Sequence, residues 1–345
     1  MSVVENEFAA DVGPSFEHAY PFEFRGTASE YFGIWIVNVL LSIITMGIYS
    51  AWAKVRRLRY FYGNTFLDGH NFEYWARPGQ ILIGRLLVFG GFGIFNISVN
   101  VSPYFYSLLI PFLFALPWLI NNSIAFHARM TSYRNLRLSF TGSYWRAFWV
   151  YVCLPAAAVL TLGILAPVAT RARTVYLAKN LSYGGVRFGG DPGLRPYFFL
   201  LLETIGLGVG IIVAVLLVFL MLQGSALSLS IFSFAILGYL CCQLFYQVGA
   251  RNIFINALRL GDTHRLESSV LRFNYIGVAI SNLLVIGLTL GLSRPWAAIR
   301  TWRYLTERTA VVSALSFDDF VGATAEGGNA AVAEFTDYQG VDLGL

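Results

Sequence analysis

The chain has 345 residues, of which 57% are hydrophobic and 12% are charged. Soluble domains carry about 25% charged residues, so the composition excludes an ordinary soluble domain and predicts a protein embedded largely in lipid. The 24 Lys and Arg outnumber the 19 Asp and Glu. Because these basic residues flank apolar segments, the expected anionic partner is phospholipid and not nucleic acid.

The N-terminal residues carry charge of the opposite sign. The first 23 residues contain five acids and no Lys or Arg, whereas a signal peptide begins with positive charge before an apolar stretch. We therefore expect residues 1–22 to form an acidic flexible segment. The first membrane-insertion signal is then internal, which fits a bacterial inner-membrane protein.

A T-x-G pattern followed by basic and aromatic residues occurs three times, in Thr45–Tyr60, Thr161–Tyr176 and Thr289–Tyr304. Repetition on this scale is typical of membrane proteins built from internal repeats. The spacing predicts two repeat units and a partial third between the two acidic tails. The expected boundaries are 1–22, 23–125, 126–250, 251–310 and 311–345.

Long apolar windows follow the T-x-G pattern in the first two units. They are Ile81–Asn100, Tyr104–Ile120, Tyr197–Leu222 and Ala226–Tyr246. Each is near the ~20 residues that a helix needs to cross a hydrocarbon core ~30 Å thick. Continuous apolar runs favour a helical bundle over a membrane barrel, whose strands alternate in short segments. We therefore expect four spanning helices.

The segments that contain T-x-G, 31–51, 147–169 and 274–298, allow two topologies. If all three crossed the membrane, the basic loops 126–146 and 170–195 would face opposite sides, although positive charge concentrates on the cytoplasmic side. If each segment enters only part-way as a helical hairpin, the conflict disappears and both termini are cytoplasmic. We favour the hairpins, and seven full crossings remain the alternative.

Short alternating segments, such as Asn64–Tyr74 and Leu136–Phe140, predict small cytoplasmic β-hairpins. The expected fold is thus an all-α polytopic membrane protein. It has internal repeats of a re-entrant or interfacial helical hairpin plus two spanning helices, in a 3+3+1 layout. Six acids and no basic residue between Ser316 and Leu345 predict an acidic disordered tail.

The first unit carries the string Y-F-G…T-x-G-I-Y-S-A-W-A-K-x-R-x-x-R-Y, followed by P-G-x-x-L-x-G-R-L. With this string, residues from about 20 to about 310 resemble the YjgN family of bacterial inner-membrane proteins, which is defined by a domain of unknown function. The resemblance implies a polytopic inner-membrane protein and assigns no catalytic or binding residue. The second unit departs from the string, with Val168 in place of the tryptophan and Val175 in place of the last arginine.

Arg85 and Glu203 are the ionisable residues deepest in the predicted spanning windows. A charge there costs about 2.5–3.5 kcal/mol on insertion scales, and it usually faces a partner or a cavity. One interpretation is a buried Arg85–Glu203 pair that lines a polar path. The other is two separate side chains, one reaching the interface and one bonded to a local hydroxyl group.

Two further groups of residues are candidates for binding. Asn38 and Asn282 lie at equivalent places in the short helices, where an amide either bonds to a neighbouring helix or contacts a substrate. The R-x-x-R-Y strings place paired guanidinium groups on one helix face, which can bind the phosphate of an anionic lipid headgroup or simply anchor the helix. These arginines are Arg56, Arg59, Arg300 and Arg303.

The motifs of common enzymes are missing from the sequence. It contains no Gly-rich phosphate loop, Cys-x-x-Cys, His-Glu-x-x-His or Gly-x-Ser-x-Gly, so we expect no enzyme, no metal site and no cofactor. Internal repeats favour transport of a small solute through a site between the repeats. The alternative is an anionic-lipid-binding or membrane-shaping protein without catalytic activity. A homo-oligomer stays open.

Overall fold

The computed structural model describes residues 18–222, 227–261, 264–313 and 322. Its strands form one closed barrel in which each strand is antiparallel to its two neighbours and β1 closes on β10. The strands are β1 (His18–Phe24), β2 (Thr65–Leu67), β3 (His70–Tyr74), β4 (Thr131–Tyr133), β5 (Leu136–Phe140), β6 (Leu181–Tyr183), β7 (Val186–Gly189), β8 (Arg259–Leu260), β9 (His264–Ser268) and β10 (Thr309–Ser313).

A pair of helices is inserted into every second connection between strands. The pairs are α2 (Ala28–Ile44) with α3 (Ser50–Gly63); α4 (Pro78–Val101) with α5 (Leu109–Arg129) through η1 (Pro103–Leu108); the continuous α6 (Tyr144–Phe148), η2 (Trp149–Cys153) and α7 (Leu154–Leu160) with α8 (Ala166–Asn180); α9 (Leu194–Leu222) with α10 (Leu227–Ala257); and α11 (Arg272–Leu288) with α12 (Arg294–Thr306).

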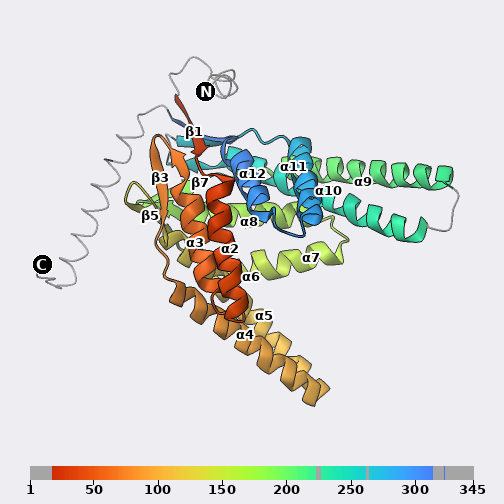
Figure 1. The fold of residues 1–345 in the computed structure, drawn as a ribbon, viewed down its shortest axis with the longest axis horizontal. Coiled ribbons are helices and arrows are strands. Elements are labelled where there is room, and N and C mark those ends of the chain that lie inside the picture. Colours follow the sequence, from red (N-terminus) through yellow and green to blue (C-terminus); the bar gives the residue numbers. More distant parts are fainter. Residues whose placement is uncertain (1–17, 223–226, 262–263, 314–321, 323–345) are drawn as a thin grey trace, which may run out of the picture.

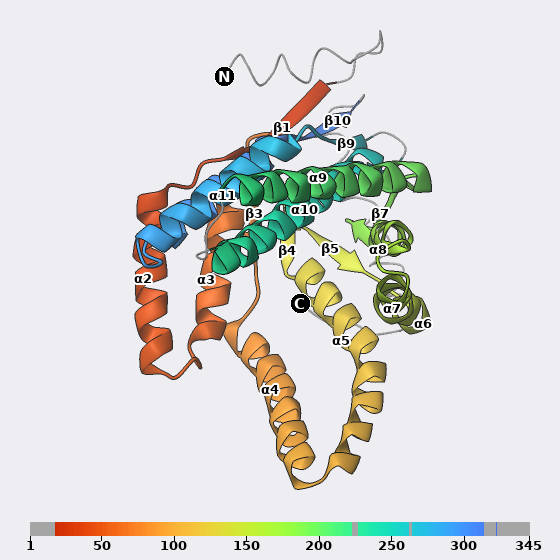
Figure 2. The same cartoon turned by 90° about the vertical axis from the view of Figure 1, so that its right-hand side faces the viewer.

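All five helical pairs leave from the same end of the barrel. Because neighbouring strands are antiparallel, connections at one end alternate in the chain with connections at the other. The helical pairs therefore share one end, the helical end, and the strand turns share the opposite turn end. His18 at the start of β1 pairs with Ser313 at the end of β10, so the chain also enters and leaves the barrel at the turn end. Figures 1 and 2 show the long pairs α4–α5 and α9–α10 projecting from the helical end and diverging.

The prediction of an all-α polytopic fold in a 3+3+1 layout is wrong. The segments expected as small separate β-hairpins join into one barrel, because Phe72 pairs with Tyr133 and Leu138 pairs with Tyr183 across the inserted helices. Several strands are only two or three residues long, too short for a clear period of two. Pairing between segments separated by a helical pair leaves no local signal in the sequence.

Three helices among the described residues are long and apolar enough to cross a membrane: Pro78–Val101, Tyr106–Arg129 and Leu194–Leu217. They correspond to the first three predicted windows. The fourth window, Ala226–Tyr246, begins in the gap at 223–226 and forms the first part of α10. Most of the two predicted flexible tails, residues 1–17, 314–321 and 323–345, lies outside the described residues.

Each T-x-G segment forms the turn of a short helical pair, as the sequence suggested for these residues. In the first turn, Thr45 Oγ1 donates to Leu41 O at 2.7 Å and accepts from the Tyr49 amide at 2.9 Å. Thr161 and Thr289 make the corresponding two bonds in the other turns. The threonine thus satisfies backbone groups that the helix ends leave open.

The residue after each turn threonine forms an apolar tip. Met46, Leu162 and Leu290 all have a left-handed backbone, with φ of 49°, 52° and 48°. The glycine that follows each of them also has a positive φ, a conformation that glycine adopts without steric cost. Each tip side chain is 95% exposed, and exposed apolar side chains of this kind mark a surface that contacts a partner or a membrane.

The core of the barrel is a cluster to which every second strand contributes one residue: Leu67, Tyr133, Tyr183, Leu260 and Val311. Tyr133 donates its hydroxyl to Leu67 O at 2.7 Å, and Tyr183 donates to Tyr133 O at 3.0 Å. Both buried hydroxyls are therefore satisfied. Burial also raises the pKa of Tyr183, so its phenol stays neutral.

Acid should destabilise the barrel through His264. Its side chain in β9 is 2% exposed, and burial lowers its pKa below the ordinary ~6.5. Unfolding lets the imidazole take up a proton, so this stability is present above about pH 6.5 and is lost as the pH falls toward the folded pKa. In thermal unfolding at pH 8 and pH 5, His264→Gln should lose less stability on acidification than the wild type. Equal acid sensitivity in both proteins would exclude this role.

Candidate functional site

A cavity of about 850 Å³ lies between α2, α3, α4 and α12, and four cations line it. They are Lys54, Arg57, Arg85 and Arg294. We call it the cationic cavity. None of its lining residues, among those that the structure describes, is acidic; its other polar groups are Tyr31, Asn38, Ser42 and Ser50. A concave site with several cations and no acid suits an anion.

Helix geometry explains how these cations converge. Lys54 and Arg57 are three residues apart in α3 and so share one helix face. Arg85 reaches from α4 and donates to Ser50 Oγ, at the start of α3. Arg294 is the first residue of α12. Residues far apart in the sequence thus meet in one cavity, where the first and last helical pairs adjoin α4.

The cations repel one another. Burial lowers the pKa of Lys54, and the positive charge of Arg85 lowers it further. Elsewhere, arginines have acidic partners, such as Asp68 for Arg134 at 2.7 Å and Asp191 for Arg171 at 2.7 Å. An anion that entered the cavity would relieve the repulsion between Lys54 and Arg85.

Asn38 adds a second indication of a ligand. Its side chain is 6% exposed and lines the cavity, and its Oδ1 has no hydrogen-bond partner among the described residues. Asn282, predicted as its equivalent, has partners within its own pair. Its amide donates to Thr301 Oγ1 at 3.0 Å, and Arg300 donates to its Oδ1 at 3.2 Å. The carbonyl oxygen of Asn38 is therefore available to accept a hydrogen bond from a ligand or a water molecule in the cavity.

Three of the arginines predicted to bind headgroups bond within the protein. Arg59 donates to Tyr74 O and Ala76 O at 3.3 and 3.1 Å, and Arg303 donates to Gly26 O at 2.8 Å. Each of these two arginines ties a helical pair to the chain that enters the next pair around the ring. Arg300 bonds to Asn282 and Ser281.

Arg56, the fourth, lies 5.8 Å from the ring of Tyr49 and lines a separate groove beside α2. The structure therefore brings together Arg85 and Asn38 of the predicted site residues. It places the R-x-x-R arginines outside the cationic cavity.

Arg85 and Glu203 contact different partners. Arg85 bonds to Ser50, whereas Glu203 in α9 forms an ion pair with Arg272 of α11. Arg272 also lies over the ring of Phe245, 4.9 Å from its centroid. Glu203 thus joins α9 to α11.

The sequence analysis missed Lys54, Arg57 and Arg294 as members of the site. One signal was available: a cation at the start of a helix opposes the helix dipole, so Arg294 at the first position of α12 is unfavourable for the helix itself. The position of Lys54 is a second signal. Lys54 follows its turn threonine by nine residues, where the other two pairs have Thr170 and Ala298.

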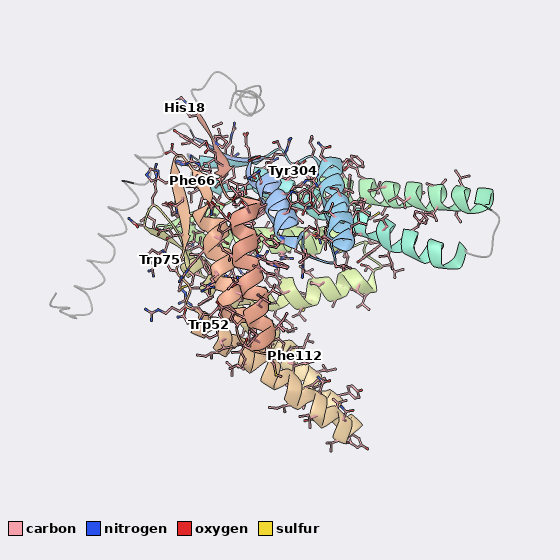
Figure 3. All side chains as sticks on the ribbon, viewed as in Figure 1. His18, Trp52, Phe66, Trp75, Phe112 and Tyr304 are labelled. Carbon is pink, nitrogen blue, oxygen red and sulfur yellow. The ribbon has the colours of Figure 1, made fainter. Side chains whose placement is uncertain are left out.

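Aromatic side chains lie both on the projecting helices and at the barrel. Trp52 and Phe112 lie on helices at the helical end, while Phe66 and Trp75 lie at the barrel (Figure 3). Trp52 is 36% and Phe112 46% exposed, and tryptophan at such a place is typical of the membrane–water interface. In the described part of the chain, no group of three or more His, Cys, Asp or Glu could hold a metal ion.

Three helices of the described chain, long and apolar enough to cross a membrane and all at one end of a β-barrel, define the class as a membrane protein. Comparison with protein families shows to which family the chain belongs. The chain belongs to the family described as "Bacterial protein of unknown function (DUF898)", whose model matches residues 19–338. The resemblance noted from the sequence is thereby confirmed.

Curated relatives are inner-membrane proteins. Inner membrane protein YjgN of Salmonella typhimurium is 26% identical over 353 aligned positions, which cover 85% of this chain and 89% of the relative. Inner membrane protein YjgN of Escherichia coli, from strain K12 and from O157:H7, is 33% identical over 155 positions, 44% of this chain and 39% of the relative. No solved structure matches the chain.

Proposed function

We propose that this protein binds the phosphate headgroup of an anionic lipid in the cationic cavity and has no catalytic activity. The observation that carries the proposal is the cavity itself, where four cations meet without a lining acid. Exposed apolar side chains on α2 and α4, such as Ile43 (70%) and Leu87 (73%), lie on the helices that form the cavity. A lipid could place its headgroup among the cations and its acyl chains along these helices.

The proposed placement in the membrane follows from helix length. Helix α2 has 17 residues, about 25 Å at ~1.5 Å per residue, which is short of a ~30 Å hydrocarbon core. The three short pairs would therefore enter one leaflet at their apolar tips, as internal repeats of one unit. The basic residues near the barrel support a cytoplasmic side for this leaflet. Because β1 begins and β10 ends at the turn end of the barrel, the proposal has both termini in the cytoplasm and a multi-pass protein.

Solute transport, the first expectation from the sequence, stays a prediction. A transport path needs helices that surround it, whereas the long pairs α4–α5 and α9–α10 diverge (Figure 1). A cavity open beside lipid-facing helices favours headgroup binding over a path through the protein. The proposal holds for one chain and does not require a homo-oligomer.

Removing cavity charge should reduce the binding of anionic lipid. For Arg57→Gln/Arg294→Gln, we expect at least about tenfold weaker enrichment of phosphatidylglycerol over phosphatidylcholine, because a charge-assisted hydrogen bond contributes about 1.5–3 kcal/mol. Native mass spectrometry of protein from mixed-lipid nanodiscs gives this ratio. The matched control, Arg137→Gln/Arg187→Gln, removes the same charge from exposed positions on β5 and β7 and should keep the enrichment.

Equal enrichment in the cavity variant and the control would overturn the proposal. A second arm adds inorganic phosphate to the wild type. If the cavity binds millimolar phosphate but the wild type shows no enrichment of phosphatidylglycerol, the cavity binds a free anion, and the proposal for a lipid fails. Unfolding temperatures of both variants show whether each is folded.

A further inference from the structure

A chain of three side chains leads from the cationic cavity toward the barrel. Lys54 Nζ, at the cavity, lies 3.3 Å from His127 Nε2 on α5. His127 Nδ1 lies 3.0 Å from the hydroxyl of Tyr74 on β3. The side chain of Tyr74 is 4% exposed, so the chain ends in the protein interior. The imidazole therefore connects an amine at the cavity with a buried phenol.

Only part of this cluster can change its charge. Arginine side chains are not deprotonated in proteins. Burial raises the pKa of Tyr74 to about 12, so its phenol remains neutral. The amine of Lys54 is different, since burial and Arg85 both lower its pKa. The titratable and charged groups that face Lys54 are Arg57 on α3, Tyr31 on α2, Arg85 on α4, His127 on α5 and Arg294 on α12.

We propose that an anion binds in the cationic cavity together with one proton, which Lys54 takes up while His127, held by Tyr74, positions its amine. The inference rests on the proposed function and adds its regulation. The proposed starting state has the amine of Lys54 in its neutral form, which burial and the charge of Arg85 favour. This amine can accept a hydrogen bond from His127. When the anion arrives, one O–H bond of a solvent hydronium ion breaks and one N–H bond forms on Lys54. The water molecule that is left returns to the solvent, and the resulting ammonium contacts the anion.

The long pairs α4–α5 and α9–α10 contain no T-x-G turn. The short pairs α6–α8 and α11–α12 contain the turn but have no lysine at the position of Lys54. Thr170 and Ala298 stand at the corresponding positions, and Thr170 Oγ1 lies 3.0 Å from the hydroxyl of Tyr246 instead. Proton uptake is therefore assigned to the cavity beside the first pair.

The affinity for the anion should change with pH in a definite direction. Because the anion raises the pKa of Lys54, affinity is highest below the pKa of the empty site and falls as the pH rises toward the pKa of the occupied site. Over that window, the affinity should fall by up to about tenfold per pH unit. Phosphatidylglycerol nanodiscs are the probe, since a phosphodiester keeps a single charge from pH 6 to pH 10.

Three variants test the assignment. Lys54→Arg keeps a permanent charge, so it should bind phosphatidylglycerol with no pH dependence. Lys54→Met should bind weakly at every pH, also with no slope. His127→Gln can still bond to Lys54 without titrating, and it should keep the slope.

A slope that survives in Lys54→Arg, or that disappears in His127→Gln, would overturn the assignment to Lys54. Wild-type binding that is equal at every pH would overturn proton coupling while leaving headgroup binding intact. No wild-type binding at any pH would instead refute the proposed function.

Discussion

Gly190→Ala should destabilise the protein by about 2–6 kcal/mol, because backbone strain and overpacking each cost about 1–3 kcal/mol. Gly190 follows β7 with a φ of 128°, and a Cβ atom there would lie 2.0 Å from Ala257 O and 2.9 Å from Ala257 C. These are backbone atoms at the end of α10, so no side-chain rotation can relieve the clash. Thermal unfolding of the detergent-solubilised protein, followed by circular dichroism, measures the loss.

Gly185→Ala is the matched control. Gly185 also has a positive φ, of 94°, but nothing lies within 4 Å of its added Cβ. It should lose only the ~1–2 kcal/mol of left-handed strain. If both variants lose the same stability, the close approach of Gly190 to Ala257 contributes nothing to barrel closure.

Charging two apolar tips should cost about 2 kcal/mol per tip in a bilayer, in line with the cost of a carboxylate moved into lipid. The variant is Leu162→Asp/Leu290→Asp, at positions that are each 95% exposed within the protein. These side chains make few contacts within the protein. The substitutions can therefore lower the stability of the protein only through the medium that surrounds the tips. The unfolding temperature in lipid nanodiscs reports the effect.

The comparison variant, Asn71→Asp/Asn135→Asp, adds the same charge at exposed positions near the turn end of the barrel. If the turn end lies in the cytoplasm, the unfolding temperature of this variant should change little. A tip variant as stable as this control would show that the tips lie in water, and the leaflet-entry proposal would fail.

Local signals in the sequence predicted the helical pairs well. The turn threonine, the left-handed residue and the glycine act within five residues, so the pattern that starts at Thr45 carries the whole turn. The first three apolar windows likewise match helices. Closure of the barrel left no such signal, because β8 has two residues and its partner β7 lies beyond α9 and α10.

The site was only partly predictable for the same reason. Arg85 and Asn38 stood out individually, since a charge and an amide are rare among apolar residues. Their meeting with Arg294 depends on the ring, which brings the last helical pair beside the first. The possible Arg85–Glu203 pair was inferred from equivalent positions in two long helices. Equivalent positions in different helical pairs lie apart around the barrel, so these two side chains do not meet.

Closure of the barrel depends on residues at the two ends of the chain: Pro21 of β1 pairs with Ala310 of β10. During synthesis, β1 leaves the ribosome first and remains without this neighbour until the last strand has been translated. Every membrane segment is therefore translated before the ring can close. An edge strand left open for that long is a template for unwanted pairing, so β1 is exposed to such pairing throughout the synthesis of each new molecule.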